Sequence, residues 1–330
     1  MAGARRARPY TARVLPSLLV FAASLALLLL AARYFTLSAE RVGLALGMSP
    51  FAIGVLIVAA GPSLPELVAS IVATSRGSSE IVIGNVLGAN LSNLLLVTGV
   101  VAVAASGGVR LGEQYILIDL HFLVGSALLL ALALRDGVLG RVEGLVLLVA
   151  FAVYLLYLIR EGRTETDLTL GGDAAAERAP APFPWRDVVV LALGAGFIYL
   201  GASYTIASLE TIARLAGVAP DLVALTLLSL GTTLPELVVS ATAARAGKAD
   251  VAIGNVLGSC VFNTLVVTGT ASLVSPLVAT QEMRELPLPV FGAGSVLFYL
   301  LTLDKRVSRW EGLLLLLVYA MFILEVARLV

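Results

Sequence analysis

Hydrophobic residues form ten long runs along the chain, separated by short polar or charged segments. The runs cover residues 14–35, 43–74, 80–105, 115–134, 139–159, 187–208, 222–245, 250–275, 286–303 and 310–330. An α-helix needs roughly 20 mostly apolar residues to cross the hydrocarbon core of a bilayer. The pattern therefore predicts an all-α integral membrane protein with ten transmembrane helices.

A polar stretch divides these runs into two groups of five. Residues 160–185 (REGRTETDLTLGGDAAAERAPAPFPW) are predicted to form a linker between a first half, residues 1–159, and a second half, residues 186–330. Because five is odd, the second half must start on the opposite face of the bilayer. The fold prediction is thus two inverted five-helix repeats, which are typical of secondary transporters that bind substrate where the repeats meet.

The N-terminal region has one feature of a signal peptide, since Arg5, Arg6, Arg8 and Arg13 precede the first run. The uncharged core of that run, residues 14–32, is longer than the apolar core of a usual signal peptide. We interpret it as a retained first helix. Lysine and arginine are almost evenly divided between the two sides, with a small excess that favours a linker inside and both termini outside.

A 39-residue segment occurs twice, at an offset of 170 residues and without gaps. Residues 61–99 (GPSLPELVASIVATSRGSSEIVIGNVLGANLSNLLLVTG) and 231–269 (GTTLPELVVSATAARAGKADVAIGNVLGSCVFNTLVVTG) are identical at 20 positions. Such agreement indicates an internal duplication. Each copy places one glutamate, Glu66 or Glu236, inside an otherwise apolar run.

Composition narrows the class of protein. Hydrophobic residues make up 59% of the chain, charged residues 13%, and the mean hydropathy is +0.99, so lipid must solvate much of the surface. The net charge of zero argues against a nucleic-acid partner. A single cysteine, Cys260, excludes an internal disulfide, and a single histidine, His121, excludes a His-rich metal site. We expect no cofactor and, without an HExxH or GxSxG sequence, no enzyme.

The two glutamates are the strongest functional signal. A carboxylate inside a membrane is costly and usually functional. The cationic residues of the repeats, Arg76, Arg245 and Lys248, lie at helix ends and not at a matching depth. A bound cation, protons, or both could therefore neutralise Glu66 and Glu236.

Oxygen-bearing residues accompany each glutamate. Gly61, Pro62 and Pro65 should interrupt the first-copy helix and free backbone carbonyls for protein, water or an ion. The side chains that can share a face with the acids are Ser63 and Ser70 in the first copy and Thr232, Thr233 and Ser240 in the second. Such oxygens are the ligands that hard cations, calcium or sodium, prefer.

The partner helix of each copy carries the sequence GNVLG, whose glycines should let another helix approach closely. A stripe with four-residue spacing follows it, Asn85, Ala89 and Asn93 in one copy and Asn255, Ser259 and Asn263 in the other. Asn85 and Asn255 could equally hold helices together. Asp119 and His121 could form a proton relay or mark the interface, and Cys260 is expected to pack.

The motifs GPSLPE with GNVLGANLSN, and GTTLPE with GNVLGSCVFN, resemble the α-repeats of the cation/calcium exchanger superfamily, in particular prokaryotic sodium/calcium exchangers. The resemblance implies a ten-helix antiporter with a diamond of ion sites between helices two, three, seven and eight. The ligand positions that it implies are Glu66, Glu236, Asn93, Asn263, Ser63, Thr232, Thr233 and Ser259, with backbone carbonyls at Ala59 and Ser229.

Three positions depart from the pattern of that superfamily. Pro62 and Ala89 replace residues that carry hydroxyl groups in many relatives, which leaves the number of sodium sites open. Asn263 stands where several prokaryotic and potassium-dependent relatives have aspartate, which makes potassium dependence less expected.

The leading functional hypothesis is exchange of Ca2+ for Na+ by alternating access in the lipid bilayer, in the cell (inner) membrane of a prokaryote. Two carboxylates give a site of charge −2, which one calcium ion neutralises and sodium ions can neutralise as well. A Ca2+/H+ exchanger on the same scaffold is the first alternative, because burial favours protonated carboxyl groups. A cation channel is a second alternative. The sequence leaves the oligomeric state open.

Overall fold

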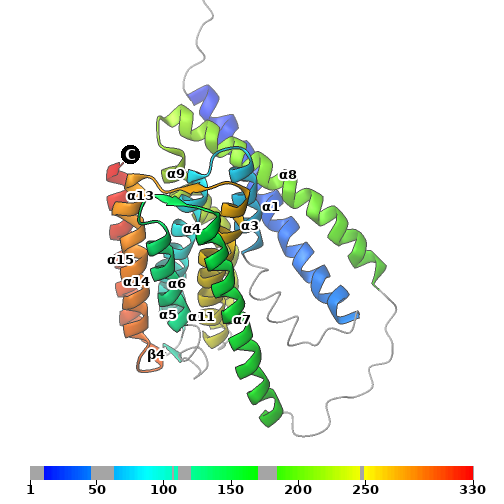
Figure 1. The fold of residues 1–330 in the computed structure, drawn as a ribbon, viewed down its shortest axis with the longest axis vertical. Coiled ribbons are helices and arrows are strands. Elements are labelled where there is room, and N and C mark those ends of the chain that lie inside the picture. The colour runs from blue at the N-terminus through cyan, green and yellow to red at the C-terminus, as the bar shows by residue number, and fades with distance from the viewer. Residues whose placement is uncertain are drawn as a thin grey trace, which may run out of the picture.

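The computed structural model of the chain describes residues 11–45, 63–105, 108–110, 120–169, 184–245 and 249–329. These residues are mainly helical (Figure 1). The first-half helices are α1 (Thr11–Ala45), α3 (Leu64–Ser75), α4 (Glu80–Leu91), the π-helix η1 (Ser92–Val97), α5 (Thr98–Ala104), α6 (Leu120–Ala133) and α7 (Arg141–Thr169). The second-half helices are α8 (Trp185–Ala216), α9 (Pro220–Val223), η3 (Ala224–Leu228), α10 (Ser229–Arg245), α11 (Ala249–Phe262), η4 (Asn263–Val267), α12 (Thr268–Val274), α13 (Gln281–Glu285), α14 (Pro287–Leu301) and α15 (Arg309–Leu329).

Six helical segments among the described residues are long and apolar enough to cross a membrane. They are Leu15–Gly43, Glu80–Ala104, Trp185–Ala216, Pro220–Val238, Ala252–Val274 and Arg309–Leu329. The other predicted spans coincide, wholly or in part, with α3, α6, α7 and α14. Residues 46–62 of the second span and residues 115–119 of the fourth span lie outside the described residues. The described elements agree with the predicted all-α class.

Several helices extend beyond the predicted runs, among them α8, which ends at Ala216 and not near residue 208. The first helix is longer than predicted at both ends, and α7 continues past the predicted linker boundary at residue 160 to Thr169. Extending an existing helix adds one hydrogen bond for each residue that is fixed, so polar residues can prolong it. Pro235 lies inside α10, which remains helical through it. The chain break that glycine and proline predict for the first copy therefore has no counterpart at Pro235.

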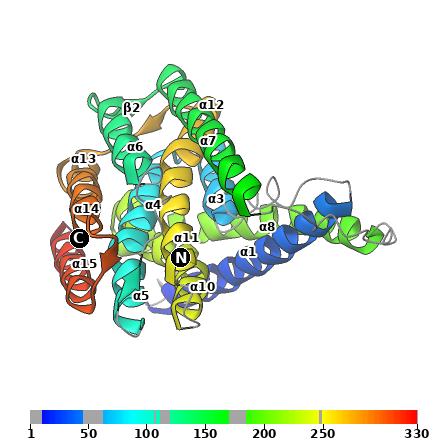
Figure 2. The same ribbon diagram turned by 90° about the horizontal axis from the view of Figure 1, so that it is seen from below.

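The helices form a compact bundle with one long helix pair beside it. Helices α1 and α8 pack along each other at an angle to the remaining helices (Figure 2), and both contact α3. The runs α4–η1–α5 and α11–η4–α12 lie inside the bundle and are the most buried of the long segments. By contrast, α7, α8 and α15 expose apolar side chains such as Val149, Leu193 and Leu317, as expected for helices that face lipid.

The contacts between helices come in pairs that the repeat relates. Helix α3 packs against η4 and α12 of the second half, and α10 packs against η1 and α5 of the first. In the same way α7 packs against α12 and α15 against α5, while α6 packs against α11 and α14 against α4. The halves are therefore interlocked, and each one completes the core of the other.

Four two-residue strands join the halves at the ends of the bundle. They are β1 (Val109–Arg110), β2 (Val138–Leu139), β3 (Leu277–Val278) and β4 (Arg306–Val307). Strand β1 pairs with β4 and β2 with β3, both antiparallel. In Figure 1, β4 lies at the lower end of the bundle and α13, which follows β3, at the upper end. Since β1 follows α5 and β3 follows α12, the runs α4–η1–α5 and α11–η4–α12 point in opposite directions.

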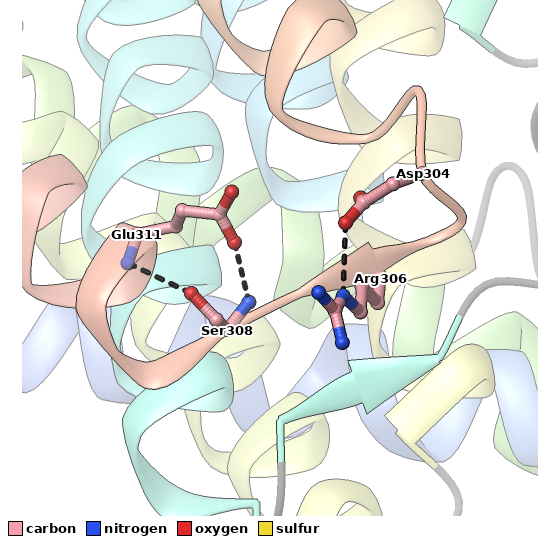
Figure 3. A network of polar contacts seen from close by, with 4 residues as sticks. All are labelled: Asp304, Arg306, Ser308 and Glu311. Atoms are coloured by element: carbon pink, nitrogen blue, oxygen red, sulfur yellow. Dashed lines mark hydrogen bonds and ion pairs between the residues drawn. The ribbon is translucent and has the colours of Figure 1, made fainter.

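The turn before α15 illustrates how local sequence sets a helix start (Figure 3). The backbone N–H of Ser308 donates to Glu311 Oε2 (2.6 Å), and the N–H of Glu311 donates to Ser308 Oγ (3.3 Å). This reciprocal pair is a capping box. Just before it, Arg306 Nε donates to Asp304 Oδ2 (2.9 Å), and this hydrogen bond lowers the pKa of the Asp304 carboxyl group.

Candidate cation site

Glu66 and Glu236 occupy different positions in their helices. Glu66 lies in the first turn of α3, two residues after Leu64, with Pro65 between them at a position where the missing N–H costs nothing. The first turn of a helix also favours a negative charge. Glu236 lies farther inside α10, directly after Pro235. Because Pro235 has no N–H, the carbonyl of Gly231, four residues earlier, lacks its helical donor.

Both carboxyl groups are buried and unpaired. Each glutamate is 1% exposed, and none of the four carboxyl oxygens has a hydrogen-bond partner among the described residues. The two groups lie within electrostatic range of each other. Thr232 adjoins Glu66, and Cys260 adjoins Glu236. Ionised carboxyl groups in such surroundings need a compensating charge, because an unpaired buried charge is far more costly than a paired one.

Other unpartnered polar atoms gather around these acids in the sequence. Of the 16 buried side-chain atoms without a hydrogen-bond partner in the described part of the chain, all except Arg284 Nε belong to residues 61–99 or 231–269. Proteins normally satisfy nearly all buried polar groups. Besides the glutamates, the predicted ligands in this set are Ser63, Asn93, Thr233, Ser259 and Asn263. The repeats therefore hold the unused oxygen atoms of the described core.

The remaining predicted ligands differ from this group. Thr232 Oγ1 donates to the carbonyl of Ser229 (3.3 Å), and Ser229 Oγ donates to the carbonyl of Leu225. Thr232 and Ser229 are thus buried but already hydrogen-bonded. Ala59 lies outside the described residues, as do Gly61 and Pro62.

Three π-helical turns mark the site, and the hydrophobic pattern of the chain does not predict them. The turn η1 begins one residue before Asn93, η4 begins at Asn263, and η3 ends directly before Ser229. A π-helical turn inside an α-helix is rare and frequently occurs at a functional site. Over five residues the hydrophobic pattern of a π-turn cannot be told from that of an α-helix. For η1 and η4, a signal in the sequence is the repeat of Asn93 as Asn263 at equivalent positions.

The glycines of the first GNVLG sequence bring α4 against α9 and η3, which lead into the second repeat. A Cβ atom on Gly84 would lie 2.2 Å from the carbonyl oxygen of Asp221, and one on Gly88 would lie 2.1 Å from that of Leu225. Both distances are too short for any side chain. The predicted close approach is confirmed for this copy, and it holds α4 beside Ser229 and the helix that carries Glu236.

Helices α4 and α11 meet at residues that the repeat relates. Asn90 and Cys260 occupy equivalent positions, and Cys260 Sγ donates to the carbonyl oxygen of Asn90 (3.8 Å). Asn90 Nδ2 donates to Thr264 Oγ1 (2.8 Å). Cys260 is buried and packs here, as predicted.

Of the two suggested relay residues, the structure describes only His121, which is not part of this arrangement. Asp119 lies outside the described residues. His121 is exposed on α6, where its ring meets the edge of Tyr299 of α14 with 5.7 Å between the ring centroids.

The chemistry of the site is that of oxygen ligands around two carboxylates. The described part of the chain contains no group of three or more His, Cys, Asp or Glu side chains that could hold a metal. The ion pairs Arg41–Asp187, Arg306–Asp304 and Arg328–Glu325 do not involve either glutamate. Carboxylate, hydroxyl and amide oxygens without a cationic side chain fit a hard cation as bound substrate.

Comparisons with known proteins agree with this chemistry. The family model described as "Sodium/calcium exchanger protein" matches residues 16–160 and 187–327. The chain is 32% identical to the CaxA protein of Alkalimonas amylolytica over 300 residues, covering 89% of this chain and 93% of that protein. It is 29% identical over 329 residues to the sodium/calcium exchanger MaX1 of Methanosarcina acetivorans, covering 88% and 92%. A solved structure of the sodium-calcium exchanger NCX_Mj, soaked with Na+ and Sr2+, superimposes with a TM-score of 0.62 at 28% identity, covering 94% of this chain and 98% of that one.

Proposed function

The chain belongs to the sodium/calcium exchanger protein family of the cation/calcium exchanger superfamily, and on that premise we propose that it exchanges Ca2+ for Na+ by alternating access. Membership makes it an integral membrane transport protein and not an enzyme. The coupling ion, the ligands and the mechanism are the proposal. We place it in the cell membrane of a prokaryote, as its prokaryotic relatives suggest.

The observation that carries the proposal is the pair of buried, unpartnered carboxyl groups. Glu66 and Glu236 come from different halves, and both are 1% exposed. Two ionised carboxylates present a charge of −2, which one calcium ion neutralises. We assign them as the main calcium ligands, completed by oxygens from Ser63, Asn93, Thr233, Ser259 and Asn263, whose side chains are buried without a hydrogen-bond partner in the described chain.

Coupling follows from the cost of moving an empty site. A doubly charged cavity is unfavourable in a low-dielectric interior, so the protein should change between its two faces only when cations compensate the carboxylates. Sodium ions can do so when spread over neighbouring oxygens. Thr232, Ser229 and Ala59 are proposed to contribute to those sodium positions. The exchange is coupled because one kind of ion must occupy the site before the other crosses.

The proposed architecture is ten transmembrane helices in two inverted repeats. It is supported by the helix contacts that the repeat relates and by the opposite directions of α4–η1–α5 and α11–η4–α12. An inverted repeat gives the site equivalent routes to both faces of the membrane. Alternating access then needs only a change in which route is open.

Ion transport into proteoliposomes tests the proposal directly. Calcium uptake is measured with sodium, potassium and proton gradients imposed one at a time, for the wild type and for Glu66→Gln and Glu236→Gln. We expect uptake driven by a sodium gradient and its loss in both variants. Uptake driven by a pH gradient alone would favour Ca2+/H+ exchange. Calcium flux without a counter-ion would indicate a channel, and full activity in both variants would refute the ligand assignment.

A further inference from the structure

Ser240 and Asn255 connect α10 to α11 through buried hydrogen bonds. Asn255 Nδ2 donates to Ser240 Oγ (3.1 Å), and Ser240 Oγ donates to the carbonyl oxygen of Ala252 (3.3 Å). Ser240 is four residues after Glu236, one helical turn closer to the end of α10. This second-half pair therefore lies one helical turn from Glu236, towards the end of the bundle where α10 ends and α11 begins.

Ser70 and Asn85 are the equivalent residues of the first half, 170 positions earlier. Both are 1% exposed. Neither the Ser70 hydroxyl nor either polar atom of the Asn85 amide has a hydrogen-bond partner among the described residues. The serine and the asparagine are thus hydrogen-bonded to each other in the second half and without a partner in the described part of the first half.

This difference argues against a purely structural role. If the asparagine only held the helices together, both halves should form the same bond, because α3 packs on α4 as α10 packs on α11. A buried amide and hydroxyl without partners cost free energy that a structural contact would recover. A polar group that is unpaired in one half and paired in the other is instead expected of a residue that binds an ion only transiently.

The chemistry of the pair indicates what that ligand is. A hydroxyl and an amide oxygen are neutral, so they can replace part of a cation's hydration shell without holding it as firmly as a carboxylate does. Ser70 is one helical turn beyond Glu66 on the side where α3 ends and α4 begins. The oxygens of Ser70 and Asn85, unpartnered among the described residues, are of the kind that bind a sodium or calcium ion on its way to or from that carboxylate.

The two pairs lie on opposite sides of the central site. The first-half pair lies near the start of α4 and the second-half pair near the start of α11. These helices run in opposite directions, since the strands that follow α5 and α12 lie at opposite ends of the bundle (Figure 1). One serine–asparagine pair thus lies towards each end of the bundle.

We propose that the first-half pair, Ser70 with Asn85, and the second-half pair, Ser240 with Asn255, are two cation-access sites that open alternately. Each pair binds a partly hydrated sodium or calcium ion when its own hydrogen bond is broken, and closes its route when that bond forms. In the structure the second-half pair has its hydrogen bond, whereas the first-half pair is buried and lacks it. This inference rests on the proposed antiport and adds sites beyond its central ligands.

Sided labelling of single cysteines tests the inference. Asn85→Cys and Asn255→Cys are made separately in a Cys260→Ser background and labelled with a charged, membrane-impermeant thiol reagent in right-side-out and inverted membrane vesicles. We expect Asn85→Cys to react from one face only and Asn255→Cys from the opposite face only, with saturating calcium slowing both. Val86→Cys and Val256→Cys are matched controls, since each valine follows the asparagine directly on the same helix, is similarly buried and contributes no oxygen to the proposed sites. Both should react from neither face.

Transport kinetics in the same vesicles provide a second readout. Asn85→Ala should raise the apparent KM for calcium about tenfold at one face and leave it unchanged at the other, because the ion loses one amide oxygen ligand. Asn255→Ala should do the reverse. A structural role would instead lower the thermal midpoint and affect both faces equally. If an alanine variant does not fold, the serine variant at the same position is measured in its place, because serine keeps one side-chain oxygen.

The outcomes separate this inference from the proposed function. Cysteines that react from the same face, or that react no faster than the valine controls, would refute the access sites while sodium-driven calcium uptake by the wild type upholds the antiport. Absence of exchange by the wild type would refute both.

Discussion

Replacing Gly88 by alanine tests whether the close approach of α4 to the second repeat maintains the site. A Cβ atom at this position would lie 2.1 Å from the carbonyl oxygen of Leu225, 2.4 Å from Ser229 Oγ and 2.7 Å from Ser229 Cβ. Ordinary contact begins at 3.4 Å. The helices would therefore have to separate by about an ångström, because a backbone carbonyl cannot rotate away as a flexible side chain can.

The expected cost follows from two opposing effects. Overpacking of a core costs about 1–3 kcal/mol, whereas alanine favours a helix over glycine by about 1 kcal/mol. We expect a net destabilisation of about 1 kcal/mol or slightly more. Calcium affinity should fall by about tenfold, equivalent to about 1.4 kcal/mol, because a displaced Ser229 shifts α10 and with it Thr233 and Glu236.

Thermal unfolding in detergent, with and without calcium, and equilibrium calcium binding measure these two effects. Gly196→Ala is the matched control, since Gly196 lies on an exposed face of α8 and its added Cβ would meet no heavy atom of the described chain within 4 Å. That variant should keep the wild-type calcium affinity and unfold at the same or a slightly higher temperature. Equal thermal midpoints and equal calcium affinities for Gly88→Ala and Gly196→Ala would refute the reasoning.

Three further predictions address charge, capping and pH. Glu66→Gln or Glu236→Gln should weaken calcium binding far more than sodium binding, because a carboxylate about 4 Å away attracts a divalent ion by about 4 kcal/mol more than a monovalent one at an effective dielectric constant of about 20; equal losses in titrations with the two ions would contradict this. Ser308→Ala should lower the free energy of unfolding by about 1 kcal/mol through loss of the capping box, and an unchanged thermal midpoint would contradict that. The lowered pKa of Asp304 means that its bond to Arg306 persists above the usual aspartate pKa and is lost as the pH falls through the lowered value. Because Asp304 is fully exposed, Asp304→Asn should not change the thermal midpoint measurably at neutral pH.

The helical class and the central residues could be predicted from the sequence because they depend on features that are local or duplicated. Run length alone locates most helices, since a membrane sets their minimum length. The offset of 170 residues pairs Glu66 with Glu236 without any knowledge of the fold. Their burial follows because an apolar run surrounds each acid.

Other features depend on contacts that a sequence pattern does not contain. Hydrophobicity predicted the end of α7 at residue 159, yet the helix continues for ten residues, because helix extension needs no apolar face. The π-turns at Asn93 and Asn263 differ from α-helix by one residue per turn, too little for periodicity to detect. The unequal hydrogen bonding of Asn85 and Asn255 could not be predicted, because the two asparagines lie in identical GNVLG sequences.

That inequality bears on how a duplicated chain can work as an exchanger. At the centre the halves are alike, because Glu66 and Glu236 are both buried and both lack a partner in the described chain. At the flanks they differ, because Asn255 is bonded to Ser240 while Asn85 has no such bond. A conformational change that exchanges these two flanking states would leave the central ligands in place and reverse the face to which they are open. The duplication then makes the second conformation possible, because each half contains the same serine and asparagine and can form or break the same hydrogen bond.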